Sequence, residues 1–215
     1  MSRKVLRFYE GVQPANDRVL YLFSDIITLW TDYKLQVRQN YINWLFPSET
    51  DTDTRLNKGL LYKFRTDKNI RLKVVKATLR MMDFFGYVIV STNNSFETKQ
   101  TKPVQREEQN VVIGLYNPEN YPRITRILTF LTGIKMELLS SLFFLMLCRA
   151  MHDNPDLKHL IMTKNVLQDW IRTQPYLESR KYDAEQALFG EKLEDWERYE
   201  SVEEVIIEKR DAWDE

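Results

Sequence analysis

The stretch between Leu138 and Cys148 limits what this chain can fold into more than any other part of the sequence. Its residues are apolar apart from Ser140 and Ser141, so a helix built from them has no polar face to turn toward water. The run is well short of the roughly 20 residues that cross a bilayer, and we therefore expect no transmembrane segment. The chain should instead fold around this helix, with amphipathic helices covering it.

Apolar residues with helical spacing predict the first of these covering helices. One should be capped by Asp17, run through residues 17–30 and break near Thr31. A second helical segment should occupy residues 33–47, where Pro47 ends it because the residue before a proline is pushed out of the α region.

Two further helices have clear start and stop signals. Asp67 can cap a helix with an apolar stripe, and Gly86 supplies a left-handed residue just beyond its end. Pro122 suits the first turn of the next helix, which should stop at Gly133. Only 6 Gly and 7 Pro in 215 residues also argue against a turn-rich all-β protein.

Two short β-rich runs, at 87–91 and 111–115, are strand candidates that could pair with each other. The polar segment 91–110 between them has no periodic pattern, and we expect it to be a mobile loop.

These patterns predict a mainly α fold: an irregular helical bundle around a central buried helix, with one short β-hairpin and a charged C-terminal helical extension. The expected helical domain covers residues 6–150 and the extension 151–215. The extension becomes acidic at residue 174, since residues 174–215 hold 6 of the 31 basic and 14 of the 31 acidic residues. A body with a net charge of plus 8 therefore carries a tail of minus 8.

The sequence offers no convincing catalytic or metal site, and we expect a non-enzymatic protein without cofactors. Cys148 and His152 share a helical face, but a thiol in so apolar a helix should be inert. One cysteine and two histidines exclude the usual zinc sites, and the lone cysteine fits an intracellular protein of the cytoplasm or nucleus. The acidic run at Asp51 fails as a calcium loop, since Leu56 and Tyr62 replace its required glycine and glutamate.

Arg123 and Arg126 are unusually placed, because both fall in the first turns of the helix opened by Pro122. A cation at that end opposes the helix dipole, so something should compensate. We expect a structural partner, either a carboxylate such as Asp32 or Asp83 or the carbonyls at a neighbouring helix end. The alternative is an anion-binding site that combines the guanidinium groups with free helical N–H groups.

Residues 41–47, YINWLFP, concentrate large apolar side chains next to a helix-ending proline. Spacing turns Tyr41, Ile42 and Leu45 inward, and Trp44 and Phe46 flank the break. A corner of the core is the favoured interpretation, and a ligand-binding box that uses Trp44 and Phe46 is the alternative.

Three segments together resemble the conserved domain of the opioid growth factor receptor family: FYEGV with LWTDYKLQVRQNYINWLFP, then MMDFFG, then NYPRITRILTFL. The resemblance covers about residues 6–147. The acidic and histidine residues typical of the family between DY and YI are Gln36, Arg38 and Gln39 here. The family-motif positions are Trp30, Asp32, Tyr33, Tyr41, Ile42, Trp44, Leu45, Phe46, Pro47, Asp83, Gly86, Arg123, Ile124 and Arg126.

The resemblance implies a helical, non-enzymatic domain in a family whose named members bind an enkephalin peptide and act at the nucleus. We therefore expect protein partners, with a peptide ligand among them. One alternative is a structural subunit of a large assembly, such as a viral capsid or virion component. Another is a nucleic-acid-associated protein that uses the basic body, with Arg71, Lys73, Lys76 and Arg80 along one helix.

Overall fold

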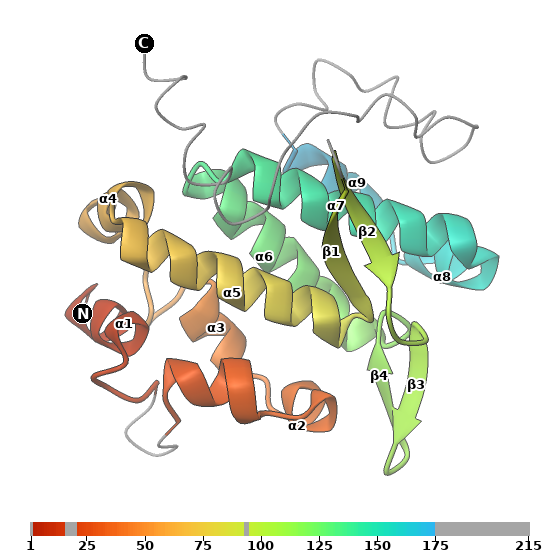
Figure 1. Cartoon of the computed structure of the whole chain (residues 1–215), viewed down its shortest axis with the longest axis horizontal. Helices are drawn as coiled ribbons and strands as arrows, with labels where there is room; N and C mark the ends of the chain where they lie inside the picture. The colour runs from red at the N-terminus through yellow and green to blue at the C-terminus, as the bar shows by residue number, and fades with distance from the viewer. Residues whose placement is uncertain (1, 16–20, 93–94, 175–215) are drawn as a thin grey trace.

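The computed structural model of this chain describes residues 2–15, 21–92 and 95–174 (Figure 1). The predicted cap Asp17 and the acidic segment from residue 175 onward lie outside the described residues. Helices dominate, together with two small antiparallel hairpins, so the predicted mainly α class is confirmed. The described helices are α1 (Ser2–Glu10), the π-helical η1 (Asp25–Leu29), α2 (Asp32–Val37), α3 (Tyr41–Leu45), α4 (Lys58–Thr66), α5 (Lys68–Phe84), the 3-10 helix η2 (Pro118–Asn120), α6 (Tyr121–Gly133), α7 (Glu137–Asp153), α8 (Pro155–Thr163) and α9 (Val166–Arg172).

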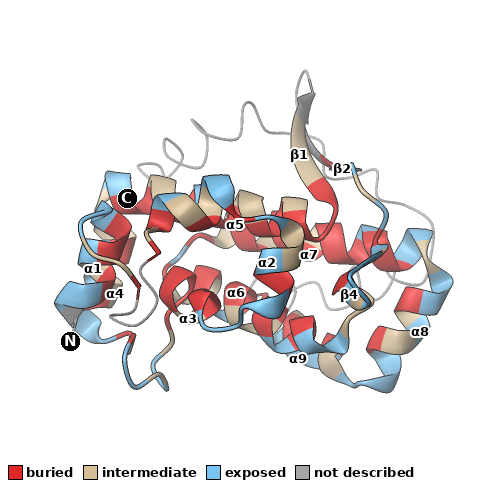
Figure 2. Cartoon of the chain, turned by 90° about the horizontal axis from the view of Figure 1, so that it is seen from below, coloured by how far each residue is buried: buried red, intermediate tan, exposed pale blue. Residues whose placement is uncertain are grey.

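Helix α7 is the central helix that the apolar run predicts. Helices α5, α6 and α8 pack against it, and it buries side chains such as Phe143, Met146 and Leu147. Figure 2 shows buried residues along α7 where it lies among its neighbours. Burial of this helix removes a large apolar surface from water and organises the rest of the bundle.

The two helices with clear boundary signals begin and end close to where the sequence predicts. The Asp67 carboxylate accepts hydrogen bonds from the N–H groups of Asn69 and Ile70 at the start of α5. Gly86, just after α5, has a φ of +95°. Pro122 lies in the first turn of α6, which ends at Gly133.

The predicted continuous helix over 33–47 is wrong, because the chain forms two short helices with an interruption between them. Thr31 caps α2 by accepting from Lys34 N–H at 3.2 Å, which confirms the predicted break before it. Arg38 then leaves the helical region at φ −95° and ψ 124°, and α3 begins at Tyr41.

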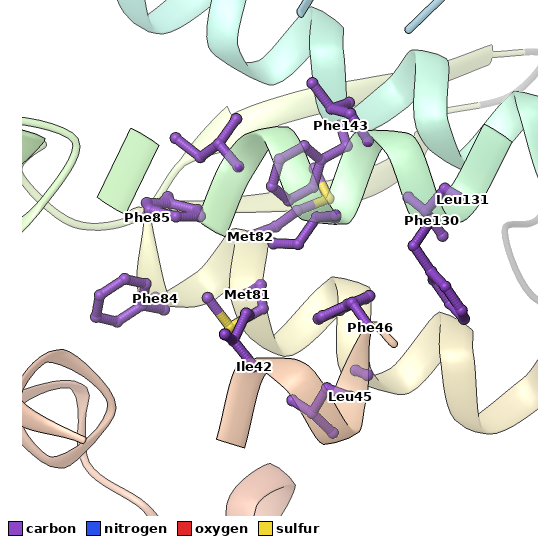
Figure 3. Close-up of a cluster of buried hydrophobic side chains, with 14 of the residues drawn as sticks. Ile42, Leu45, Phe46, Met81, Met82, Phe84, Phe85, Phe130, Leu131 and Phe143 are labelled. Atoms are coloured by element: carbon purple, nitrogen blue, oxygen red, sulfur yellow. The ribbon is translucent and has the colours of Figure 1, made fainter. Parts of the chain in front are cut away.

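Residues 41–47 form a buried corner of the core (Figure 3). Phe46 packs edge to face against Phe130 of α6, with ring centroids 5.8 Å apart, and the Tyr9 hydroxyl donates to the Leu45 carbonyl. The buried apolar side chains of the segment are Tyr41, Ile42, Trp44, Leu45 and Phe46.

The strand pairing predicted from the sequence is also wrong. β1 (Tyr87–Thr92) pairs with β2 (Ser95–Gln100), and β3 (Gln105–Glu108) pairs with β4 (Val111–Gly114), both antiparallel. Much of the expected loop 91–110 is therefore strand. Gln109 and Asn110, between β3 and β4, both have positive φ, as the two central residues of a type I′ hairpin turn require. Neither is glycine, so the turn lacks its usual sequence signal.

Helices α8 and α9 belong to the same core as the preceding bundle. Leu157, Ile161 and Trp170 are buried within it, and the Trp170 indole N–H donates to the Thr125 hydroxyl of α6 at 2.9 Å. A left-handed residue, Asn165 with φ 55°, separates the two helices.

We expect Gly86→Ala to lower the free energy of unfolding by about 2 kcal/mol or more. An added Cβ would combine a positive φ with a contact of 2.7 Å to the Lys102 carbonyl oxygen. The matched control is Gly133→Ala in α6, where a Cβ would meet nothing within 4 Å. Urea unfolding should show the control as stable as the parent or slightly more so. Equal stability of the two variants would contradict the expectation.

Candidate functional site

Arg123, in the first turn of α6, holds the end of α2. Its two terminal nitrogens donate to the carbonyls of Leu35 at 2.9 Å and Gln36 at 3.0 Å, and its guanidinium lies 5.8 Å from the ring centre of Tyr41. The side chain is buried. Its charge therefore faces the negative end of the α2 dipole, which compensates for its position at the start of α6.

Arg126, one turn later, joins the 41–47 corner to the loop that follows it. It binds both carboxylate oxygens of Asp51, at 2.9 and 3.0 Å, and donates to the Phe46 carbonyl at 3.3 Å. Asp51 also accepts from the Thr54 hydroxyl at 2.7 Å. Burial raises the pKa of Asp51, but its hydrogen bonds from Arg126 and Thr54 outweigh this and leave the pKa below its ordinary value.

Asp32 and Asp83, the carboxylates expected to bind these arginines, bind three other cations instead. Arg80 lies 3.0 Å from Asp32 and 2.9 Å from Asp83, and Lys102 lies 3.1 Å and 2.8 Å from the same two. Arg106 also pairs with Asp32. These ion pairs tie the start of α2 to the end of α5, to the β2–β3 connection and to β3. Burial raises the pKa of Asp32, yet the hydrogen bonds from Arg106 and Lys102 bring it below its usual range.

The basic residues of α5 do not form an open face for phosphates. Arg71 is buried and donates to the Arg65 carbonyl at 3.4 Å, and Lys73 donates to the Tyr9 carbonyl. Arg80 belongs to the Asp32 group, and Lys76 is exposed. Three of the four cations considered for nucleic-acid binding therefore have internal partners.

Cys148, the nucleophile considered from the sequence, is buried. Burial raises the pKa of the Cys148 thiol to about 12, so the thiolate needed for nucleophilic attack is scarce at neutral pH. His152 is exposed at the end of α7. Across the described ranges, no group of three or more His, Cys, Asp or Glu side chains is placed to hold a metal ion.

An open groove of about 530 Å³ lies where the end of α2 meets β4 and η2. Figure 2 shows α2 and β4 on the same side of the molecule, and the two elements contact each other. Its apolar wall includes Val37, Val112, Tyr116 and Pro118, and Glu119 is its one charged lining residue among those described. We call it the α2–β4 groove.

Amide side chains organise the inner side of this groove. Asn120, fully buried, donates from Nδ2 to the Gly114 carbonyl and to Gln36 Oε1, both at 2.8 Å. Asn117 donates to the Val112 carbonyl at 2.8 Å. Gln36 lines the groove and is only 2% exposed, yet no described residue accepts from its Nε2.

The groove does not contain the side chains suspected of binding from the sequence. Trp44 and Phe46 are buried in the corner, where Trp44 lies beside Phe8, and Arg123 and Arg126 hold carbonyls and Asp51. In the sequence, Gln36 stands out only as a departure from the family pattern. Its orphan amide could not be found from the sequence, because it depends on Asn120, which lies far away along the chain.

The sequence model of the opioid growth factor receptor (OGFr) conserved region matches residues 2–181, most of the chain. The chain belongs to this family. The match confirms the resemblance of the three quoted segments and continues through α8 and α9. No curated protein sequence and no solved structure gives a significant match to this OGFr-family chain. None of its described helices is both long and apolar enough to cross a membrane.

Arg126→Met should lower the free energy of unfolding by about 1–3 kcal/mol, because it leaves the Asp51 carboxylate and the Phe46 carbonyl without their donor. The side chains of the Arg126–Asp51 pair are only 23% and 9% exposed. Arg172→Met is the control, since that arginine and Asp169 are 75% and 57% exposed. Chemical denaturation should show a change below about 0.5 kcal/mol for the control. An unchanged melt for Arg126→Met with loss of partner binding would instead assign Arg126 to a binding site.

Asp51→Asn should reduce the loss of stability in acid. The pKa of Asp51 is lower in the folded state than its unfolded value near 4. The carboxylate therefore stabilises the fold at pH values above the unfolded pKa, and this stabilisation disappears as the pH falls through the lower folded pKa. Unfolding free energies between about pH 6 and pH 2 should therefore converge for the parent and the variant toward the acid end. Asp53→Asn, at an exposed position of the same loop, should follow the parent throughout. A constant offset between Asp51→Asn and the parent would contradict this expectation.

Proposed function

We propose that this chain is a non-enzymatic interaction domain that binds a peptide or a short segment of a partner protein. The observation that carries the proposal is the family match over residues 2–181, since the family is described as a receptor for a growth factor. A receptor needs a surface for its ligand and no reactive groups. The α2–β4 groove, an open hollow of about 530 Å³, is a candidate for that surface.

The chemistry of the described residues supports a binding role over catalysis. The charged groups around Asp32 and Asp51 have their partners inside the fold. The Cys148 thiol is buried. We place the domain in a reducing compartment, the cytoplasm or the nucleus, because it contains a single cysteine.

A structural subunit of a larger assembly, such as a virion, is the second candidate. Several large apolar side chains are exposed on helices or loops away from the groove, including Val12, Leu29 and Tyr62. Side chains of this kind are common at protein interfaces. The internal partners of Arg71, Lys73 and Arg80 make nucleic-acid binding the least supported of the alternatives.

The purified 215-residue chain should be a monomer that binds an enkephalin pentapeptide with 1:1 stoichiometry. We expect a dissociation constant below about 1 mM by isothermal titration calorimetry, and at least about tenfold weaker binding of a scrambled pentapeptide. Sedimentation velocity on the same sample gives the oligomeric state. If the chain forms a large homo-oligomer and binds neither peptide, the receptor proposal is rejected in favour of the structural subunit.

A further inference from the structure

Helices α4 and α5 carry charges of almost one sign. Residues 55–80 contain nine Lys or Arg and a single acidic residue, Asp67, whose carboxylate caps α5. Four of these cations have partners inside the fold: Arg65, Arg71, Lys73 and Arg80. The other five are exposed: Arg55, Lys58, Lys63, Lys68 and Lys76. The exposed charged side chains of this stretch are therefore all basic.

Other elements add cations to the end of the molecule where α4 lies. Helix α1 contacts α4 and α5, and Arg3 and Arg7 are exposed on it (Figure 1). Arg65 of α4 binds the Gly133 carbonyl at 2.7 Å, which places the exposed Lys135, two residues further on, at the same end. We call this surface the basic end, and its members are Arg3, Arg7, Lys58, Lys63, Lys68 and Lys135.

The described part of the chain supplies few carboxylates to balance the basic end. None of its six cations forms an ion pair with another described residue. Helices α1 and α4 together contain one acidic residue, Glu10, and Glu137 at the start of α7 is half-buried. Like charges gathered at one end repel one another, so this surface favours an anionic occupant. Tyr62, 65% exposed between Lys58 and Lys63 along α4, offers an aromatic side chain that the occupant can cover.

The described part of the chain ends beside this surface. Gln174 is buried, and its Nε2 donates to the Ser140 hydroxyl at 3.1 Å. The Thr132 hydroxyl donates to the Thr173 carbonyl at 2.7 Å. Both contacts lie where α6 ends and α7 begins, next to Lys135. The segment that follows Gln174 therefore starts beside the basic end.

The segment 175–215 has the charge and the side chains that match the basic end. Its 41 residues hold 14 acidic and 6 basic residues, so its net charge of minus 8 is equal and opposite to that of the body. Within it, the sequence EDWERYE at 194–200 places two aromatic side chains among four carboxylates. At up to ~3.3 Å per residue, a segment of this length can reach every cation of the basic end.

We propose that the acidic segment 175–215 docks on the basic end of the same chain, with carboxylates on Lys58, Lys63 and Lys135 and an aromatic side chain on Tyr62. Exposed ion pairs are individually weak, so several must form together. Attachment to the same chain favours this, because a tethered ligand has a high effective concentration. Any other polyanion must displace the segment to reach these cations. The inference goes beyond the proposed function, since the basic end contains no residue of the α2–β4 groove.

A zero-length carbodiimide reaction on the full 215-residue chain tests the docking, because it joins a carboxylate to a lysine amine only where the two are in contact. By mass spectrometry, we expect the acidic segment to be joined to lysines of the basic end at least about tenfold more often than to Lys99 and Lys164. Those two lysines are exposed on β2 and after α8. Raising the salt concentration from about 0.05 M to about 0.5 M should reduce the products at least about threefold, because salt screens exposed charges. Equal joining to all lysines would overturn the proposal.

An equal mixture of ¹⁴N- and ¹⁵N-labelled chains identifies the source of the docked segment. Products that join peptides of the same label support docking within one chain. If about half of the products join different labels, as random pairing gives, a second copy supplies the segment and the proposal is overturned. An equimolar single-stranded oligonucleotide of about 20 nucleotides should leave the yield within about twofold. A loss of at least about fivefold would make a nucleic acid the occupant and overturn the proposal.

Matched substitutions test the cations themselves. Lys58→Glu combined with Lys63→Glu should lower the joining of the acidic segment to Lys135 at least about fivefold, because two attractive charges become repulsive. Lys99→Glu combined with Lys164→Glu makes the same change in net charge at exposed positions and should leave the joining within about twofold. Thermal melts of both variants should stay close to that of the parent, since exposed substitutions change stability little. Unchanged joining in a folded Lys58→Glu, Lys63→Glu chain would overturn the assignment of these two lysines.

Discussion

The fold depends on basic side chains that satisfy main-chain carbonyls at the ends of buried helices. The last four carbonyls of any helix lack partners within it, and α2 and α3 are so short that these carbonyls make up most of each helix. Helices of this length are unstable alone. Arg123 binds the last turn of α2, Arg126 the cap of α3 and Arg65 the Gly133 carbonyl at the end of α6. Each cation also faces the negative end of a helix dipole.

The same principle applies to further cations of the body. Arg106 and Lys102 donate to carbonyls at the end of α5, and Arg80 donates to the Trp30 carbonyl that closes η1. At least six of the 25 basic residues of the body therefore have carbonyl acceptors inside the fold: Arg65, Arg80, Lys102, Arg106, Arg123 and Arg126. The described lining of the α2–β4 groove contains Glu119 and no Lys or Arg, so this hollow is not basic although the body is.

Local signals predicted the long elements well. The cap at Asp67, the left-handed Gly86 and the apolar run of α7 each act within a few residues of the helix that they define, so the sequence alone was sufficient. The predictions that failed concern contacts between residues far apart in the sequence, and a turn that contains no glycine. The break between α2 and α3 coincides with the carbonyls that Arg123 holds, and the β3–β4 turn uses Gln109 and Asn110 at positive φ. The groove was missed for the same reason, because its orphan amide exists only where Gln36 and Asn120 meet.

These contacts also set an order in which the native structure can be completed. Arg126 and Asp51 are 75 positions apart, Arg123 and Leu35 are 88, and Arg65 and Gly133 are 68. During synthesis the ends of α2 and α3 leave the ribosome long before the arginines that close them, and pairings across such distances slow folding. We therefore expect the first hundred or so residues to reach their full order only after α6 has been synthesised. Arg123 and Arg126 of α6 are thus expected to complete the ends of α2 and α3 late in folding. In a shortened chain that stops before α6, we expect α2 and α3 to be destabilised although their own residues are present.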